Sequence, residues 1–484
     1  MQVLFFVPCC LLHRNKTNTQ IALDSTTGAV SRVKLSYATS PSTTASTQLA
    51  HPDDDSTSAL LTAQLSSLSF SAFNNSIATL AVRDSLYSPG EFDAFKAIAA
   101  VERDLKTIYV REANHAHQQI TETSTTRSNT TPWTCRHSAF TLTLMNGHGV
   151  CLVNFRSLLG VSLVYWVDRA ELLDVVPGSS IGEKWLSSVV DADQVFSARV
   201  AYVAADAAKS DGISVDVLES YDTHGYLVVD DEMNVSMSYE EENLSVSSFD
   251  GLQFSFRTGR NIQSGDDAIS KPVPQAAFCL EFHPPVPSTR KCHAELLSSL
   301  SKSIKENSSL DSQQHHSQIS KTAAAVPTFL ESLYTSSASV FAAPSKTVLH
   351  AFRRYGSSKV RISNNVGNDV CVLIETIPFA HPSQVLSILK AVRRQVTFNT
   401  LVKSCFAATA EVKTLVQIAE IVQLDSPHSI LMNVVSISTA KTVQVKILVE
   451  DNGVKVVGEE GQVFDKFGVV LDATLDFGVA LEYI

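Results

Sequence analysis

Hydrophobic residues recur along this 484-residue chain with two different periods, and the two periods occupy separate blocks. In residues 385–396 the apolar positions lie three or four apart, which is the spacing of one face of an α-helix. In residues 443–449 every second residue is apolar, and Asp451-Asn452-Gly453 follows as a turn, which predicts a β-hairpin. Because no regular succession of strand and helix accompanies these patterns, they favour an α+β, multi-lobed fold in which amphipathic helices pack against antiparallel sheets.

The patterns divide the chain into four predicted regions. Residues 1–134 are expected to form an N-terminal hairpin and a helical region, and residues 135–300 a β-rich region. Residues 301–325 have little periodicity and much polarity, which indicates a flexible linker. Residues 326–484 then form a C-terminal α+β region. The length agrees with this division, since a chain of this size exceeds one ordinary core and predicts two or three domains.

The N-terminal region carries the clearest local signals. Residues 20–37 alternate around a turn and predict a hairpin, and residues 59–86 predict two short amphipathic helices. A longer helix is expected from Ser88, where a capping box with proline at the first helical position begins. On that helix Glu102 and Lys106 are one turn apart, which predicts an ion pair on its outer surface.

The β-rich region contains two strands with strong alternation, around residues 252–256 and 278–282. The sequence HPPVP at residues 283–287 follows the second strand directly. Because proline has no amide hydrogen to donate to a ladder, this sequence predicts that the strand ends there.

The charge balance argues against direct binding to nucleic acid. The chain has 49 Asp plus Glu and 38 Lys plus Arg, a formal net charge of −11, and its basic residues occur in pairs rather than clusters. A protein that binds duplex DNA through phosphates needs a dense basic face. We therefore expect no direct nucleic-acid contact.

No metal, cofactor or membrane signal is found in the sequence. The eight cysteines are scattered without a Cys-x-x-Cys pair, which predicts buried thiols in a reducing compartment. His115 and His117 are two residues apart on a predicted helix and so point in different directions. Residues 146–150, NGHGV, lack the lysine and hydroxyl residue of a phosphate loop. No apolar run reaches the roughly 18 to 20 residues that span a bilayer.

One motif supports an alternative enzymatic function. Gly178-Ser179-Ser180-Ile181-Gly182 fits the G-x-S-x-G elbow of serine hydrolases, with Ser180 as the nucleophile. Pro177 stands where the preceding strand should still donate hydrogen bonds, and the chain lacks the repeated β-α units of that fold. A simple Pro-Gly turn is the preferred interpretation, and a serine hydrolase remains an alternative.

A second alternative is a secreted β-rich glycoprotein. Residues 3–12, VLFFVPCCLL, have the length of a signal-peptide core but follow no basic residue and precede no small-residue cleavage site. A buried strand is therefore preferred. Chance matches in a chain rich in serine and threonine account for the six N-glycosylation sequences, which begin at Asn15, Asn74, Asn129, Asn234, Asn243 and Asn307.

Two stretches, considered together, resemble the conserved folded region of the Mediator complex subunit 1 family. The first is a Phe-x-His-Pro element leading into a basic helix that ends in Asn-Thr-Leu and Ser-Cys, and the second is an apolar strand that ends in Pro-x-Pro and Ser-x-Arg. The residues that carry the resemblance are Phe379, His381, Pro382, Arg394, Gln395, Val396, Asn399, Thr400, Leu401, Ser404 and Cys405, and Pro285, Pro287, Ser288 and Arg290. Weaker similarity to the same family extends over residues 20–480, approximately.

The resemblance implies a non-enzymatic, nuclear subunit of the Mediator middle module that acts as a structural and interaction scaffold in RNA polymerase II transcription. Its implied partners are other middle-module subunits and transcriptional activators, with RNA polymerase II reached indirectly and no cofactor. The Leu-x-x-Leu-Leu boxes of animal members are absent from the sequence, so nuclear-receptor binding is not expected. The helical sequence that family members carry ahead of the first hairpin is also missing, which suggests an incomplete N-terminus.

The basic side of the helix predicted within residues 379–405 is the candidate partner site. Lys390, Arg393 and Arg394 lie off the apolar stripe and are expected to form an edge that faces solvent or a partner. Two interpretations stay open. The charges keep a packed helix soluble, or they contact an acidic neighbour.

Overall fold

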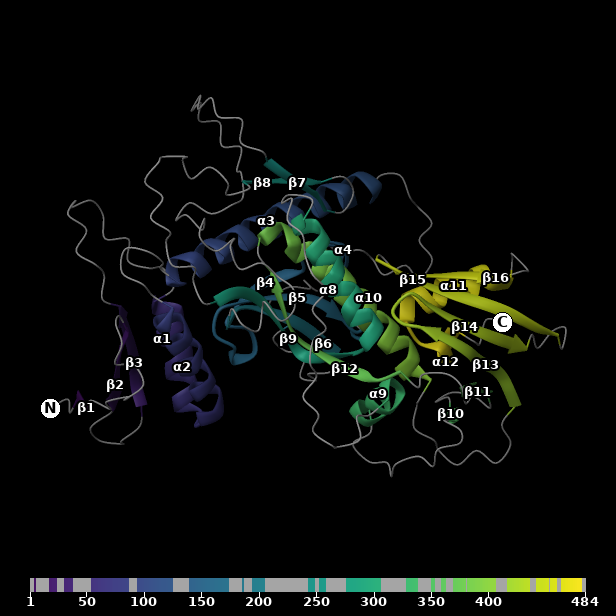
Figure 1. Cartoon of the computed structure of the whole chain (residues 1–484), viewed down its shortest axis with the longest axis horizontal. Helices are drawn as coiled ribbons and strands as arrows, with labels where there is room; N and C mark the ends of the chain where they lie inside the picture. The colour runs from purple at the N-terminus through teal and green to yellow at the C-terminus, as the bar shows by residue number, and fades with distance from the viewer. Residues whose placement is uncertain are drawn as a thin grey trace.

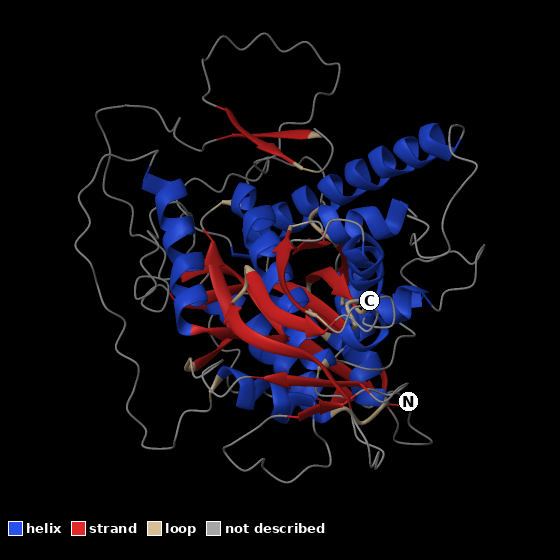
Figure 2. Cartoon of the chain, turned by 90° about the vertical axis from the view of Figure 1, so that its right-hand side faces the viewer, coloured by secondary structure: helices blue, strands red, loops and turns tan. Residues whose placement is uncertain are grey.

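The computed structural model contains helices and several antiparallel sheets, which confirms the α+β prediction (Figure 1). Most strands cross the middle of the molecule with helices around them, and one strand pair lies apart at the top of the view (Figure 2). The structure describes residues 4–5, 17–23, 30–37, 54–86, 94–124, 139–173, 185–186, 194–204, 243–248, 252–257, 276–305, 328–337, 350–352, 358–362, 369–379, 381–405, 416–435, 441–451, 453–458 and 463–480.

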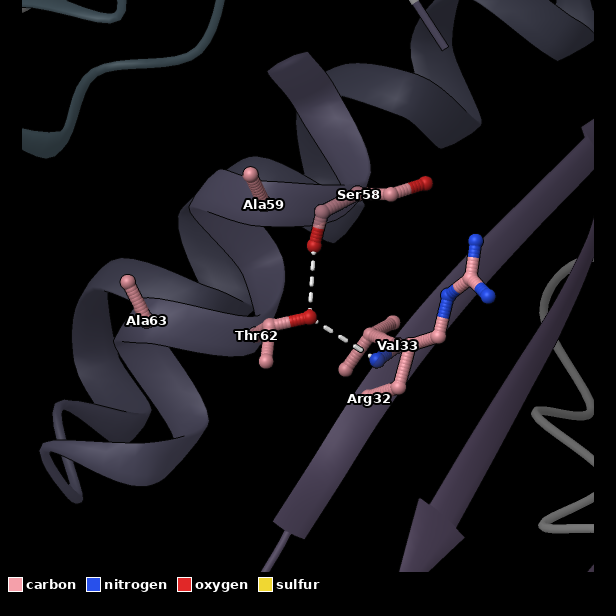
Figure 3. Close-up of a pocket in the computed structure, with 6 residues that line it drawn as sticks. All are labelled: Arg32, Val33, Ser58, Ala59, Thr62 and Ala63. Carbon is pink, nitrogen blue, oxygen red and sulfur yellow. Dashed lines mark hydrogen bonds between the residues drawn. The ribbon is translucent and has the colours of Figure 1, made fainter. Parts of the chain in front are cut away.

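The N-terminal part is a three-stranded antiparallel sheet beside a pair of helices. The predicted hairpin and the two short helices are confirmed, and the described part of the 3–12 segment is a short strand. These elements are β1 (Leu4–Phe5), β2 (Thr17–Leu23), β3 (Val30–Tyr37), α1 (Asp54–Ser66) and α2 (Phe70–Ser85). Thr62 joins helix to sheet, because its hydroxyl accepts from the Val33 amide at 2.8 Å and donates to the Ser58 carbonyl at 2.7 Å (Figure 3).

A five-stranded antiparallel sheet follows, in the order β12-β9-β6-β5-β4. Its strands are β4 (Val150–Val153), β5 (Val161–Val167), β6 (Val195–Ala204), β9 (Ala276–Thr289) and β12 (Cys371–Phe379). The helical segments between α2 and β6 are α3 (Ala94–Ser124), α4 (Ala139–Asn146), η1 (Phe155–Ser157) and α5 (Arg169–Leu173). All seven residues of β5 are buried, as expected for a strand covered on both faces.

The C-terminal part is a six-stranded sheet in the order β10-β11-β13-β14-β15-β16, antiparallel except where β11 pairs with β13. Its strands are β10 (His350–Phe352), β11 (Ser358–Ile362), β13 (Val416–Asp425), β14 (Ser429–Val435), β15 (Thr442–Glu450) and β16 (Gly453–Gly458). Helices α11 (Val463–Thr474) and α12 (Phe477–Ala480) follow it. The predicted hairpin is confirmed by the pairing of β15 with β16, in which Glu450 lies opposite Gly453, and Asn452 of the predicted turn lies outside the described residues.

The remaining elements are a separate hairpin and three helices around the sheets. They are β7 (Asn243–Ser247), β8 (Gln253–Arg257), α8 (Arg290–Lys305), α9 (Phe329–Ser337) and α10 (Val385–Ser404). Helix α10 contacts both large sheets, through β5 and β9 on one and β15 on the other (Figure 1). One apolar cluster runs from the five-stranded sheet through α10 to the six-stranded sheet.

Strand β9 corrects one prediction. It does not end at HPPVP but continues through it to Thr289. Pro284 and Pro285 lie beyond the last residue that pairs with β6, His283, and opposite the register shift of β12 between Ile374 and Thr376. Pro287 lies opposite Leu373 of β12, and its carbonyl accepts from the Asn399 side chain.

The predicted regions do not correspond to separate sheets. Strand β12, from the predicted C-terminal region, pairs with β9, from the predicted β-rich region. Residues 301–305 of the predicted linker are the last residues of α8, and residues 306–325 lie outside the described part of the chain. The division into four regions stays a prediction about the sequence, but its second and fourth regions share one core.

The ion pair predicted on the outer surface of α3 is wrong for Glu102. Its side chain is buried, with Arg83 at 4.0 Å, and it accepts from the Val161 amide at 3.2 Å. The buried face of α3 is thus wider than its hydrophobic stripe, because it includes the side chain of Glu102. The capping sequence at Ser88 lies outside the described residues.

Candidate functional site

Helix α10 begins where its sequence predicts. His381 precedes the short turn η5 (Pro382–Gln384), and its ring accepts from the Ser383 amide at 3.1 Å. The Gln384 side chain accepts from the His381 amide at 3.2 Å, which completes a capping box. Pro382 fits the first turn because the amide it lacks would have no helical partner. The Phe-x-His-Pro element is therefore the physical start signal of the helix.

Helix α10 is buried on most of its surface. Of its 20 residues, 13 are buried, including the polar Arg393, Gln395 and Asn399. A helix with only one apolar stripe would leave such side chains in solvent. Helix α10 is therefore a core helix, and its polar residues need partners inside the protein.

Arg393 does not lie on the exposed edge that the sequence predicts. It is 4% exposed, and its Nε donates to the Tyr165 carbonyl at 2.9 Å. Its Nη2 donates to the carbonyls of Leu144 and Gly147, at 3.0 and 2.9 Å. A guanidinium can bind these three carbonyls at once because its N–H donors are fixed in one plane. Arg393 thus joins α10 to β5 and to the turn after α4.

Glu112 on α3 supplies the strongest electrostatic compensation for this buried arginine. Burial lowers the pKa of Arg393 to about 10, and the negative charge of Glu112 opposes that shift. Since that pKa lies well above neutral, Arg393 keeps its charge inside the protein. A buried charge is tolerated only with such compensation.

Glu112 also fixes the turn between α4 and β4. Its carboxylate accepts from the His148 amide at 2.9 Å, contacts His148 Nδ1 at 2.8 Å and accepts from the Ser248 hydroxyl. A Cβ atom added at Gly147 would lie 2.3 Å from Glu112 Oε2, so a side chain there would displace the carboxylate. Gly147 of NGHGV therefore has a packing role.

Gln395 and Asn399 join the two stretches that carry the family resemblance. The Gln395 Oε1 accepts from Ser288 Oγ at 3.2 Å, and the Gln395 Nε2 donates to Asn399 Oδ1 at 2.8 Å. The Asn399 Nδ2 then donates to the carbonyl of Pro287 at 2.7 Å. The Pro-x-Pro strand end and the helix are thus two sides of one buried hydrogen-bond network.

Lys390 and Arg394 occupy the half-buried side of α10. Arg394 pairs with Asp451 in the β15–β16 turn, and its side chain is 28% exposed. The part of the chain that the structure describes gives Lys390 no ion pair. The structure therefore separates the three predicted residues: Arg393 is internal, whereas Lys390 and Arg394 reach the surface.

The other sequence candidates form no reactive site in the described residues. No three His, Cys, Asp or Glu side chains gather there, and the ring of His115 contacts Gln119 at 3.1 Å. Ser180 and its motif lie outside the described ranges, so the hydrolase alternative stays a prediction. A hollow of about 390 Å³ lies between α1 and β3, and Arg32 is the one ionisable residue among its described lining residues (Figure 3).

The cysteines of the described part are free and buried, as predicted. They are Cys151, Cys279, Cys292, Cys371 and Cys405. Burial, together with the negative charge of Glu281, raises the pKa of Cys279 to about 12, so this thiol is protonated and unreactive at neutral pH. None of the described helices is long and apolar enough to cross a membrane.

Comparison with known families decides the relationship of the chain. The sequence model of the family described as Mediator of RNA polymerase II transcription subunit 1 matches residues 19–407. The chain belongs to this family. Membership makes it a Mediator subunit in transcription regulation, with other Mediator subunits and the transcription machinery as its partners. Subunits of Mediator work in the nucleus. No curated protein matches the chain.

The sequence did not point to Glu112, His148 and Ser248 as one group. Their separations along the chain are 36 and 136 residues, and no local pattern connects them. The available signal was weak: a polar residue on the apolar side of α3 and a glycine on each side of His148. A buried polar residue on a predicted core face calls for an internal partner.

Proposed function

We propose that this protein is a non-enzymatic subunit of the Mediator middle module and acts there as a structural and interaction scaffold in the nucleus. The match of the Mediator subunit 1 family to residues 19–407 carries this proposal. Its partners would be other middle-module subunits and transcriptional activators, with RNA polymerase II contacted through the rest of the assembly. The net charge of −11 supports protein partners rather than nucleic acid.

The use of buried polar groups supports the scaffold role. Arg393, Gln395 and Asn399 hydrogen-bond to other segments of the same chain, and Glu112 holds a turn. Groups engaged in this way fix the relative positions of helices and strands. These groups position the helices and strands, which gives partner subunits a surface of defined shape.

The surface side of α10 remains our proposed partner contact, now reduced to Lys390 and Arg394. Both lie on one helix, where an acidic partner would meet the positive charge of Lys390 and would compete with Asp451 for Arg394. Charge reversal at both positions should weaken association with Mediator, whereas Lys446→Glu on the exposed face of β15 should not. Unchanged association of the double variant would remove this contact from the proposal.

The experiment that tests the proposed function is purification of the tagged chain from its own cells at moderate salt, followed by quantitative mass spectrometry. We expect middle-module subunits in amounts equal to the tagged chain. An intact, soluble preparation that lacks them would overturn the middle-module proposal.

A further inference from the structure

The helical hairpin α1–α2 carries no charged side chain over most of its length. Between Ser56 and Val82 the sequence contains no Asp, Glu, Lys, Arg or His, although 18% of the whole chain is Asp, Glu, Lys or Arg. Charge-free surface is unusual on a protein of net charge −11, because charged side chains normally keep exposed helices soluble. The centres of protein–protein interfaces show this depletion of charge.

The turn between the two helices exposes two large apolar side chains. Leu68 is 70% exposed and Phe70 is 60% exposed, the highest values among large hydrophobic residues of the described chain. We call these two residues the hairpin tip. Their immediate neighbours Ser67, Ser69 and Ser71 are exposed and polar but uncharged. An aromatic and an aliphatic side chain within a neutral polar rim is the arrangement of an interface anchor.

The backbone of Leu68 at the hairpin tip is strained. Leu68 has φ 58°, in the left-handed region that favours glycine. It stands at the glycine position of a Schellman turn, in which the Ser69 amide donates to Gln64 O at 2.8 Å and the Leu68 amide donates to Leu65 O at 3.1 Å. A leucine there lowers the stability of the turn and gains no core contact, so a use outside the chain accounts for it.

The tip is held in place from inside. Leu61, Leu65 and Leu80 fill the buried side of the hairpin. The Gln64 Nε2 donates to Ser76 Oγ at 3.0 Å and to the carbonyl of Ser157 at 2.8 Å, which joins α1 to α2 and to the turn before β5. The hairpin therefore cannot rotate to bury Leu68 and Phe70 within its own core.

We propose that the hairpin tip docks into an uncharged apolar pocket of another Mediator subunit. This inference rests on the proposed function and names the surface through which it operates. A membrane or nucleic-acid partner would need exposed cationic residues, whereas Arg83, the cationic residue of α1–α2, is buried beside Glu102. A second copy is disfavoured because two chains of net charge −11 repel each other.

The test compares three full-length proteins: wild type, Leu68→Gly/Phe70→Ser, and the control Val110→Ser/Val469→Ser. The control removes two other exposed apolar side chains, which are 54% and 52% exposed. Each protein is titrated against Mediator purified from cells that lack this subunit. We expect roughly tenfold or greater weakening for the tip variant and less than about twofold for the control. Because glycine suits the backbone of residue 68, the thermal midpoint of the tip variant should not fall.

Photo-crosslinking identifies the occupant. Benzoylphenylalanine at position 70 should crosslink one Mediator subunit, whereas the same group at position 110 should not. If the wild type binds and the tip variant binds equally, the tip proposal is wrong and the proposed function stands. If the wild type does not bind purified Mediator, the proposed function itself fails. A crosslink between two copies of the chain would also overturn the tip proposal.

Discussion

The five-stranded and six-stranded sheets both contact α10, but they do so with different chemistry. On the five-stranded side Arg393 donates to a carbonyl of β5 and Asn399 donates to a carbonyl of β9. On the six-stranded side alternate residues of β15 are buried and apolar. The polar contacts of α10 with that sheet, in the described chain, involve Ser426 and Asp451, which follow β13 and β15.

The apolar contacts and the hydrogen bonds of α10 therefore have different effects: the first stabilise the helix in the core, and the second position it. Apolar contact is favourable in any orientation that buries area, so the six-stranded sheet adds stability without fixing the rotation of the helix. A buried hydrogen bond is directional and costs free energy when it is not made. The five-stranded side therefore sets how far α10 is rotated and shifted along its axis.

The family match follows the same division. It covers residues 19–407, which include the five-stranded sheet and all of α10, and it ends before β13 begins at Val416. The part of the chain that resembles Mediator subunit 1 is thus the part in which α10 is positioned by polar contacts. Four of the six strands of the other sheet lie beyond the match.

The largest expected effect is at Arg393. Arg393→Met removes the donor from three buried carbonyls, so we expect a loss of about 3–5 kcal/mol in the free energy of unfolding. Urea unfolding of the full chain measures it. Arg393→Lys keeps the charge without the planar fork and should recover only part of the loss. If Arg393→Met lowered the free energy of unfolding by less than about 1 kcal/mol, the proposed role of the five-stranded sheet in positioning α10 would be contradicted.

The next effect is at Asn399. Asn399→Leu keeps the approximate volume but takes away the donor to the Pro287 carbonyl and the acceptor of the Gln395 Nε2, which should cost about 1–3 kcal/mol. Thr400→Ala, one residue along the same helix, is the matched control, because Thr400 is half-buried and bonds only within its helix. Equal losses for the two variants would show that the network adds nothing to stability.

A small substitution on the six-stranded side of α10 should lower the free energy of unfolding less than the loss of a buried hydrogen-bond donor. Ile447→Val on β15 removes one buried methyl group and should cost about 1 kcal/mol. Lys446→Ala, the adjacent residue on the exposed face, should change the free energy of unfolding by less than about 0.5 kcal/mol. A loss at Ile447 as large as that at Arg393 would abolish the contrast between the two sides.

The smallest expected effect is at Arg394. Its pairing with Asp451 is partly exposed, so Arg394→Met should cost no more than about 1 kcal/mol, and less in high salt. Chemical unfolding in low and high salt measures both quantities. A large, salt-independent loss would mean that this pair also positions the helix.

Local signals predicted local structure well. The turn at residues 451–453 and the alternation before it give the β15–β16 hairpin, because both depend on neighbours along the chain. Helix α10 was predicted by its apolar stripe and by the His-Pro sequence that starts it. In each case the determining contacts lie within a few residues.

The environment of Arg393 could not be read from the sequence. Its carbonyl partners on Tyr165 and Leu144 are 228 and 249 residues away, and carbonyls carry no sequence signal. The continuation of β9 past its prolines was missed for the same reason, since it depends on where β6 stops and how β12 is registered. Non-local pairing decides both features.

The central claim is that α10 is the buried centre on which the two sheets meet, rather than a surface helix with a basic side. Hydrogen–deuterium exchange of the full chain tests it most directly, by comparing residues 385–404 with residues 70–85 of α2. We predict that the α10 amides exchange at the rate of global unfolding and that the α2 amides exchange through faster local opening. Equally fast exchange in the two helices would contradict the claim.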